Sequence, residues 1–144
     1  MKLDAIYTQL ITENSRSTRH KHAVSPVTFT KRGHNPSCGD DITISVRVTD
    51  GILEDLGFDG VGCAISQASV TMMIDLVKGK SIAEAVEIVK TFLDMITGSE
   101  LSEDKLDTLE DAQALSGVAK MPARVKCAVL AWRTLEGELA KLEN

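Results

Sequence analysis

Asp40-Asp-Ile-Thr-Ile-Ser-Val-Arg-Val-Thr-Asp-Gly-Ile-Leu-Glu-Asp-Leu-Gly-Phe58 is the stretch that decides the fold. Its first half alternates aliphatic with polar residues, and this period of two is typical of a strand with one buried face. An Asp-Gly pair follows, which favours a two-residue type I′ turn between antiparallel strands. We therefore predict a β-hairpin whose returning strand covers residues 52–58.

The open end of this hairpin gathers residues that can bind a metal ion. With the Asp-Gly pair at the turn, the register places Ile42 opposite Asp59, and extrapolation places Cys38 opposite Cys63. Loops leave the ladder before that point. The topology nevertheless brings Cys38, Asp40 and Cys63 to one end of the hairpin.

The chain before the hairpin is predicted to contain one helix and one short strand. Apolar residues at helical spacing predict a helix over residues 3–11. A basic segment at 16–22 has no apolar period, and we expect a loop in which His20 and His22 are solvated. The β-like run at 27–30 then predicts an edge strand.

The chain after the hairpin is predicted to be mainly helical. One helix starts near Cys63 and ends at 78–79, and a second, over 81–96, opens with capping-box spacing. Residues 99–121 are acidic and weakly periodic, so we expect short helices or an ordered excursion there, with the acidic stretch 100–111 as a solvated surface. Pro122 suits the first turn of a last, long helix.

In the last helix the apolar stripe and the cysteine are predicted to lie on different faces. The stripe starts at Val125 and recurs at spacings of three and four. Cys127, about 200° from Val125 around the axis, should face away from the main seam. Arg124 shares the face of Cys127.

Composition excludes several classes of protein. A chain of 144 residues, of which 43% are hydrophobic, can bury one core, so a disordered protein is excluded. The formal net charge of −5 argues against nucleic-acid binding. The first residues do not resemble a signal peptide, and no run of apolar residues is long enough to cross a membrane. We expect a cytoplasmic protein that binds neither nucleic acid nor membrane, with its three cysteines reduced.

Cys38, Asp40, Cys63 and Cys127 together are a plausible tetrahedral ligand set for a divalent ion such as Zn²⁺. Each has a simpler interpretation, because a free cysteine is often only a buried hydrophobe and Asp40 alone could cap a turn. The polar surroundings of Cys38 favour a ligand there. His34, close to Cys38 in the sequence, is a possible substitute ligand.

Four segments together resemble the SufU branch of the IscU-like iron–sulfur cluster assembly proteins, a family related to the N-terminal domain of NifU. The segments are Asn35-Pro-Ser-Cys-Gly-Asp40, Gly57-Phe-Asp-Gly-Val-Gly-Cys-Ala-Ile-Ser-Gln-Ala-Ser69, Val77-Lys-Gly-Lys-Ser81 and Pro122-Ala-Arg-Val-Lys-Cys127. The resemblance implies one α+β domain over 1–144, in which a small antiparallel sheet of about three strands packs against several helices. It also implies a metal site formed by Cys38, Asp40, Cys63 and Cys127, with zinc as the usual ion.

Two departures from the broader IscU pattern favour the SufU branch. Lys126 stands where the IscU pattern has a histidine, and residues 99–121 form an insertion. The basic stretch at 16–25 departs from the family pattern and has no assigned role.

The resemblance implies a zinc-dependent sulfurtransferase that acts with a PLP-dependent cysteine desulfurase of the SufS type, and whether it counts as an enzyme is left open. Cys38 would leave the metal and accept persulfide sulfur for downstream cluster-assembly proteins. Arg124 is either a charge-compensating residue or a solvated cation. The alternatives are a scaffold that builds a transient [2Fe–2S] cluster, with iron in the site, and a structural zinc domain. The sequence leaves open the oligomeric state and whether His34 enters the site.

Overall fold

A three-stranded antiparallel sheet forms one side of this computed structural model, which describes residues 3–143. In spatial order its strands are β1 (Phe29–Asn35), β2 (Asp40–Thr49) and β3 (Ile52–Val61). Asp50 and Gly51 have φ angles of 51° and 77°, the two left-handed residues that a type I′ turn requires. The predicted hairpin is therefore confirmed.

The register of the hairpin shifts part-way along β2 and β3. Next to the turn Val48 pairs with Leu53, as predicted, but further on Ile42 pairs with Gly60 and not with Asp59. The predicted pairing is wrong there because a β-bulge adds one residue to β3. As predicted, the ladder between β2 and β3 ends before Cys38 and Cys63, so these two residues do not pair across it.

Burial explains the bulge. Leu53, Leu56 and Phe58 are all buried, and their spacings of three and then two fit one face of a strand only with an extra residue between the first pair. A regular strand continued from Leu53 would instead turn Asp55 and Asp59 toward the core. The spacing was therefore a readable signal for the bulge.

The helices lie before and after the hairpin in the chain, in the predicted order. They are α1 (Leu3–Arg16), α2 (Ala64–Val77), α3 (Ile82–Ile96), α4 (Glu103–Asp107), the 3₁₀ helix η1 (Glu110–Lys120) and α5 (Pro122–Leu142). α1 continues about one turn beyond its predicted end. The predicted capping box is present, because the Ser81 hydroxyl accepts the Glu84 N–H at 3.1 Å and the Glu84 carboxylate accepts the Ser81 N–H at 3.2 Å.

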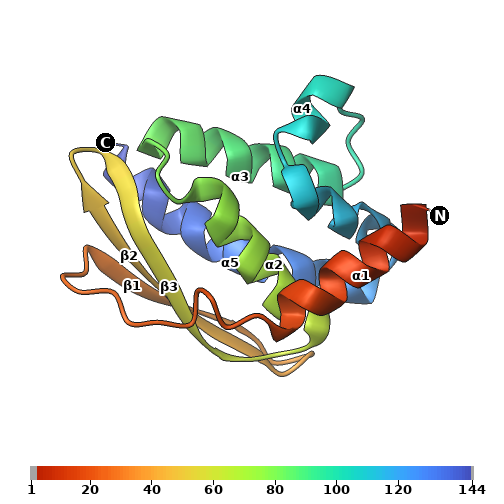
Figure 1. Ribbon diagram of the computed structural model, residues 1–144, viewed down its shortest axis with the longest axis horizontal. Coiled ribbons are helices and arrows are strands. Elements are labelled where there is room, and N and C mark those ends of the chain that lie inside the picture. Colours follow the sequence, from red (N-terminus) through yellow and green to blue (C-terminus); the bar gives the residue numbers. More distant parts are fainter. Residues whose placement is uncertain (1–2, 144) are drawn as a thin grey trace.

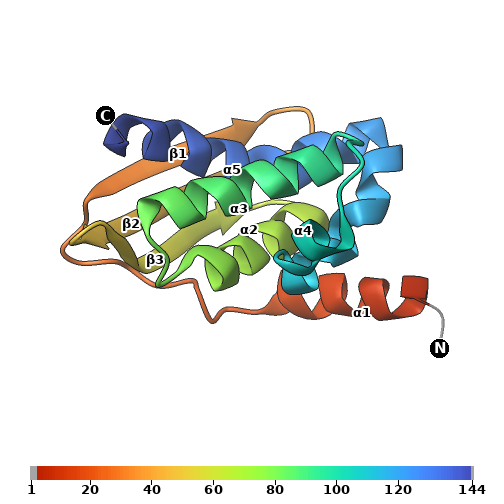
Figure 2. The ribbon, with the colours of Figure 1, turned by 90° about the horizontal axis from the view of Figure 1, so that it is seen from above.

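The helices cover one face of the sheet (Figure 1). α5 packs on β1 and β2, and α2 packs on β3. α3 lies over α2 and α5 on the side away from the sheet, and α1 lies beside α2 (Figure 2). The core between these layers contains the buried, stacked rings of Phe92 and Trp132, with centroids 3.8 Å apart.

β1 is longer than predicted, and α5 explains its position. The edge strand expected over 27–30 overlaps only the first two residues of β1. Most of β1 is polar, which hid it from the periodicity, and in its second half only Gly33 and Asn35 are buried. Gly33 packs so closely on α5 that an added Cβ would lie 2.3 Å from Thr134 Oγ1.

Residues 17–28, which we call the strap, run from α1 along the β3 edge of the sheet and then cross to β1, where the Thr28 N–H donates to the Val46 carbonyl of β2 (Figure 2). The His20 carbonyl accepts the Phe58 N–H at 2.9 Å. An added Cβ on Gly57 would lie 2.2 Å from the His22 carbonyl oxygen, so the strap touches the strand itself. The strap thereby covers an edge that could otherwise pair with another chain.

The strap corrects one prediction about the histidines. His20 was expected to be solvated, yet it is buried, and its Nε2 lies 2.6 Å from Asp75 Oδ1 on α2. Arg19 binds the same carboxylate. His22 is exposed, and its Nε2 lies 3.0 Å from Asp55 Oδ1 on β3. Arg19, His20 and His22 of the basic segment are therefore paired with aspartates of the helix and the sheet.

Candidate metal centre

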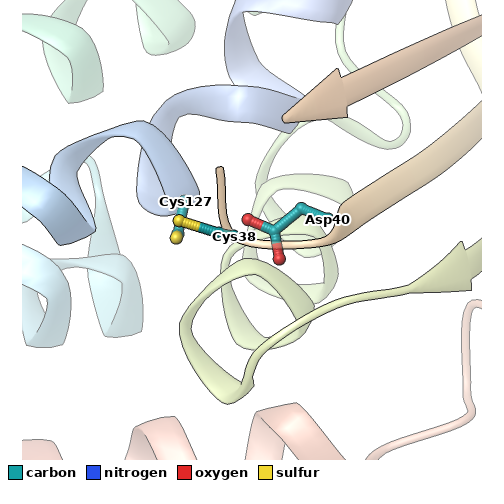
Figure 3. Close-up of side chains that lie close together, drawn as sticks. All are labelled: Cys38, Asp40 and Cys127. Atoms are coloured by element: carbon teal, nitrogen blue, oxygen red, sulfur yellow. The ribbon is translucent and has the colours of Figure 1, made fainter. Parts of the chain in front are cut away.

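Three of the four predicted ligands meet at one end of the sheet (Figure 3). One ligand atom from each of Cys38, Asp40 and Cys127 lies within 4.8 Å of the other two. Asp40 is the first residue of β2, Cys38 lies in the turn before it, and Cys127 lies in the second turn of α5. The site therefore joins the sheet to α5.

The turn between β1 and β2 positions Cys38. Its N–H donates to the Asn35 carbonyl at 3.2 Å, and Gly39 takes a φ of +70°, a conformation that glycine adopts without strain. The Cys38 Sγ lies 3.9 Å from the Ala123 carbonyl oxygen in the first turn of α5. Cys38 is partly exposed, whereas Asp40 and Cys127 are buried.

Asp40 has one oxygen engaged and one without a partner. Its Oδ1 accepts the Cys63 N–H and the Ser66 hydroxyl, each at 3.0 Å. Its Oδ2 is buried and has no hydrogen-bond partner among the described residues. Because an unpaired buried carboxylate oxygen is costly, Oδ2 is the atom that fits a metal ion.

Cys63 borders the cluster without belonging to it. It is the N-cap of α2, and in the described part of the chain its thiol is not in the group within 4.8 Å. The Cys63 thiol is nevertheless one of the groups that raise the pKa of Cys127. Cys63 is therefore adjacent to the centre, as the hairpin topology predicted, but the structure does not bring it into the cluster.

Cys127 contradicts the predicted orientation. It is 1% exposed, because the turn containing Cys38 and the start of β2 pack against the face that was expected to lie away from the main seam. Burial raises its pKa most, and then the neighbouring Cys38, Asp40 and Cys63 raise it further. An isolated thiol in this place stays protonated, whereas coordination of a cation would make it a thiolate.

The buried face of α5 is also shifted from the predicted stripe. Val125 and Val129 are only half-buried. The fully buried residues of the helix are Cys127, Ala128, Ala131, Trp132, Leu135 and Leu139.

The remaining candidates lie outside the cluster. His34 is exposed and pairs across the strands with Asp41, which is bound by Arg32 on the outer face of the sheet. Arg124 and Lys126 are exposed on α5. Among residues 3–143 none of these side chains belongs to the group of possible ligands.

Two supporting residues were missed by the sequence interpretation. Ser66, one turn into α2, donates to Asp40 Oδ1. Gly62 leaves room for this contact, since an added Cβ would lie 2.3 Å from Ser66 Oγ and 2.7 Å from Asp40 Oδ1. Ser66 is three residues after Cys63, which places both residues on one side of the first turn of α2. That spacing was the only sequence signal that Ser66 lies near the site.

The donor set fits a zinc ion. Two cysteine sulfurs and a carboxylate oxygen are ligands that zinc accepts, and Cys63 could supply a further sulfur beside them. The unpartnered Asp40 Oδ2 is the atom that a cation would satisfy, and coordination would convert the buried Cys127 thiol to a thiolate.

Residues 6–128 match the family described as the NifU-like N-terminal domain. The chain belongs to this family. A member from Bacillus subtilis (strain 168), the zinc-dependent sulfurtransferase SufU, is 42% identical over 142 residues, which are 99% of this chain and 95% of that protein. The iron–sulfur cluster assembly scaffold protein IscU of Thermotoga maritima is 34% identical over 100% of this chain and 99% of that protein.

A solved structure confirms the fold predicted for a member of this family. The crystal structure of an iron–sulfur cluster assembly scaffold protein for the SUF system from Fervidobacterium islandicum superposes with a TM-score of 0.86. The two chains are 33% identical, with 96% of this chain and 99% of that chain covered. Across residues 3–143, no helix of this NifU-like chain has the length and apolar character needed to span a bilayer.

Proposed function

We propose that this protein is a zinc-dependent sulfur acceptor in iron–sulfur cluster assembly. It would take persulfide sulfur from a PLP-dependent cysteine desulfurase of the SufS type and pass it to downstream cluster-assembly proteins. The observation that carries the proposal is one partly exposed thiol, Cys38, grouped with the buried Asp40 and Cys127. The 42% identity to a zinc-dependent sulfurtransferase supports it. We place this chemistry in the cytoplasm, where thiols stay reduced.

The residues that would hold zinc are Cys38, Asp40 and Cys127, with Cys63 beside them. Asp40 would bind through Oδ2, since Oδ1 is engaged by the Cys63 N–H and by Ser66. When bound, the ion keeps the coordinating thiols as thiolates at neutral pH, and so supplies the nucleophilic form of cysteine.

Cys38 is the residue that we assign as the sulfur acceptor. Its thiolate attacks the outer sulfur of the partner's persulfide, so that a new S–S bond forms on Cys38. The S–S bond of the donor breaks, and the donor cysteine leaves as a thiolate. Access decides the choice of residue, because Cys38 lies in an exposed turn while Cys127 is 1% exposed.

Arg124 is proposed to offset the negative charge of the site when a partner docks. It is exposed in the first turn of α5, three residues before Cys127. We expect Arg124→Ala to lower sulfur transfer to Cys38, measured by labelling of the persulfide, while the zinc content measured by metal analysis stays unchanged. Loss of zinc and of transfer together would instead indicate a structural role.

A second candidate function is a scaffold for a transient [2Fe–2S] cluster. The relatives from Thermotoga maritima and Streptococcus pyogenes, named as IscU scaffold proteins, are 34% and 37% identical and favour it. The same thiolates could hold a cluster. Zinc that iron and sulfide cannot displace under anaerobic conditions supports the sulfur acceptor, whereas its replacement by a cluster supports the scaffold.

The deciding experiment measures desulfurase turnover with zinc-loaded and zinc-stripped protein. The sulfur-acceptor function requires that only the zinc-loaded protein accelerates turnover, and equal rates would contradict it. Cys38→Ser should keep most of the unfolding free energy and lose the acceleration, whereas Cys63→Ser should chiefly lose stability. A structural zinc domain would give two variants that behave alike.

A further inference from the structure

The side-chain amide of Asn35 is buried beside the proposed metal centre without a partner. Asn35 is 8% exposed, and its Nδ2 has no hydrogen-bond partner among the residues that the structure describes. An amide N–H that is buried without an acceptor is destabilising. Such a group suggests that an acceptor is supplied in another state of the protein.

The fold points this amide toward the site. Asn35 is the last residue of β1 and lies directly opposite Asp40, the first residue of β2. Burial alternates at the end of β1, where Gly33 and Asn35 are buried and His34 between them is exposed. The Asn35 side chain is therefore on the helix-facing side of the sheet, as is Asp40.

The two facing residues carry complementary unpaired groups. Asn35 Nδ2 is a donor and Asp40 Oδ2 is an acceptor, yet they do not bond to each other. The Asn35 carbonyl accepts the Cys38 N–H at 3.2 Å, so the same residue also fixes the turn that carries Cys38. Asn35 is thus connected to two of the proposed ligands, to Cys38 by a backbone hydrogen bond and to Asp40 by strand pairing.

We propose that Asn35 is a positioning residue of the metal centre, whose Nδ2 donates a hydrogen bond to a ligand sulfur when the ion is bound. This inference rests on the proposed function, since it requires that the site holds zinc. Thiolates and a carboxylate around one divalent ion leave excess negative charge. A neutral N–H donor offsets part of this charge and fixes the orientation of the ligand that it contacts.

The test is Asn35→Leu, which keeps the size of the side chain and removes both polar atoms. The metal-free variant should be as stable as the wild type, because an unpaired buried amide has been replaced by an apolar group. Its zinc affinity should fall roughly 10- to 100-fold, the usual effect of losing a group that supports a metal ligand. The thiolate-to-metal charge-transfer band of the Co²⁺-loaded protein should also shift.

Thr71→Val is the matched control. Thr71 Oγ1 is another buried group without a partner in the described chain, and it lies two turns along α2 from Cys63. This variant should also keep its metal-free stability, but its zinc affinity and Co²⁺ spectrum should equal those of the wild type. Wild-type affinity and spectrum in Asn35→Leu would overturn the proposal.

A measurement on the wild-type protein covers the case in which Asn35→Leu does not fold. The Asn35 side-chain amide protons should move downfield in the NMR spectrum when zinc is added, while those of Asn14, which donates to the Leu10 carbonyl, should not. Unmoved Asn35 protons in a zinc-bound protein would overturn the inference. A wild-type protein that binds no zinc would instead defeat the proposed function.

Discussion

At the scale of single residues, Gly62 decides whether Asp40 keeps its orientation. A Cβ added at Gly62 would lie 2.3 Å from Ser66 Oγ and 2.7 Å from Asp40 Oδ1. The Ser66 hydroxyl could rotate away, but it would then lose its bond to Asp40. The lack of a side chain at Gly62 is therefore required for the geometry of the site.

We expect Gly62→Ala to cost about 1–3 kcal/mol of unfolding free energy through steric conflict and to lower zinc affinity. Denaturant titration and metal analysis measure the two effects. Gly137→Ala on α5 is the control, because no atom lies within 4 Å of its added Cβ. It should leave zinc affinity unchanged and add about 0.5–1 kcal/mol of stability. Unimpaired zinc binding by Gly62→Ala would show that the Ser66–Asp40 contact is not needed.

At the scale of elements, the strap is held to α2 by one carboxylate. Asp75 accepts hydrogen bonds from Arg19 and contacts His20. The negative charge of Asp111 on η1 also raises the pKa of Arg19. Burial alone would raise the pKa of Asp75, but the bonds to Arg19 and His20 outweigh it and lower the pKa below its usual 3.8. The strap is therefore stabilised by the ionised form of Asp75.

A carboxyl group with a lowered pKa stabilises the fold above its unfolded-state pKa and loses this effect as the pH falls through its folded-state pKa. We expect Asp75→Asn to be less stable than the wild type by about 1 kcal/mol at pH 7, because the carboxylate is partly exposed. The difference should begin to shrink as the pH falls to about 4, the unfolded-state pKa, and vanish only below the lowered folded-state pKa. Urea titrations across this range measure it, with the exposed turn variant Asp50→Asn expected to track the wild type throughout. A difference that persists in acid would show that the charge is not its cause.

At the scale of the whole molecule, the proposed metal ion would tie separate layers together. Asp40 comes from the sheet, Cys38 from the turn between β1 and β2, and Cys127 from α5, with Cys63 at the start of α2. A ligand that binds only the folded protein stabilises it by mass action. A bound ion would therefore act on the global unfolding equilibrium as well as on the loop of Cys38.

We expect a chelator to lower the melting temperature of the zinc-loaded protein, and added zinc to restore it. A structural zinc site can contribute roughly 10 kcal/mol or more, which sets the scale of the effect. Calorimetry with and without chelator measures the shift. Asp40→Ala should show little response to either reagent, and an equal response from this variant would exclude Asp40 as a ligand.

Much of this architecture was readable from local sequence patterns. The alternation before Asp50 and Gly51 predicted the hairpin, and Ser81 with Glu84 predicted the start of α3. The β-bulge was missed, although the spacing of Leu53, Leu56 and Phe58 contained it. β1 was placed too early, because an edge strand covered by α5 at Gly33 needs few apolar residues of its own.

The sequence by itself determined the local elements and the supply of thiol and carboxylate ligands, because backbone preferences and side-chain chemistry act over a few residues. Only the tertiary structure decided that Cys127 is buried against Cys38 and Asp40, that Cys63 stays at the border, and that the basic strap is paired. These outcomes depend on which surfaces pack together. Packing is set by contacts between residues far apart in the chain, and helical periodicity in one segment cannot report them.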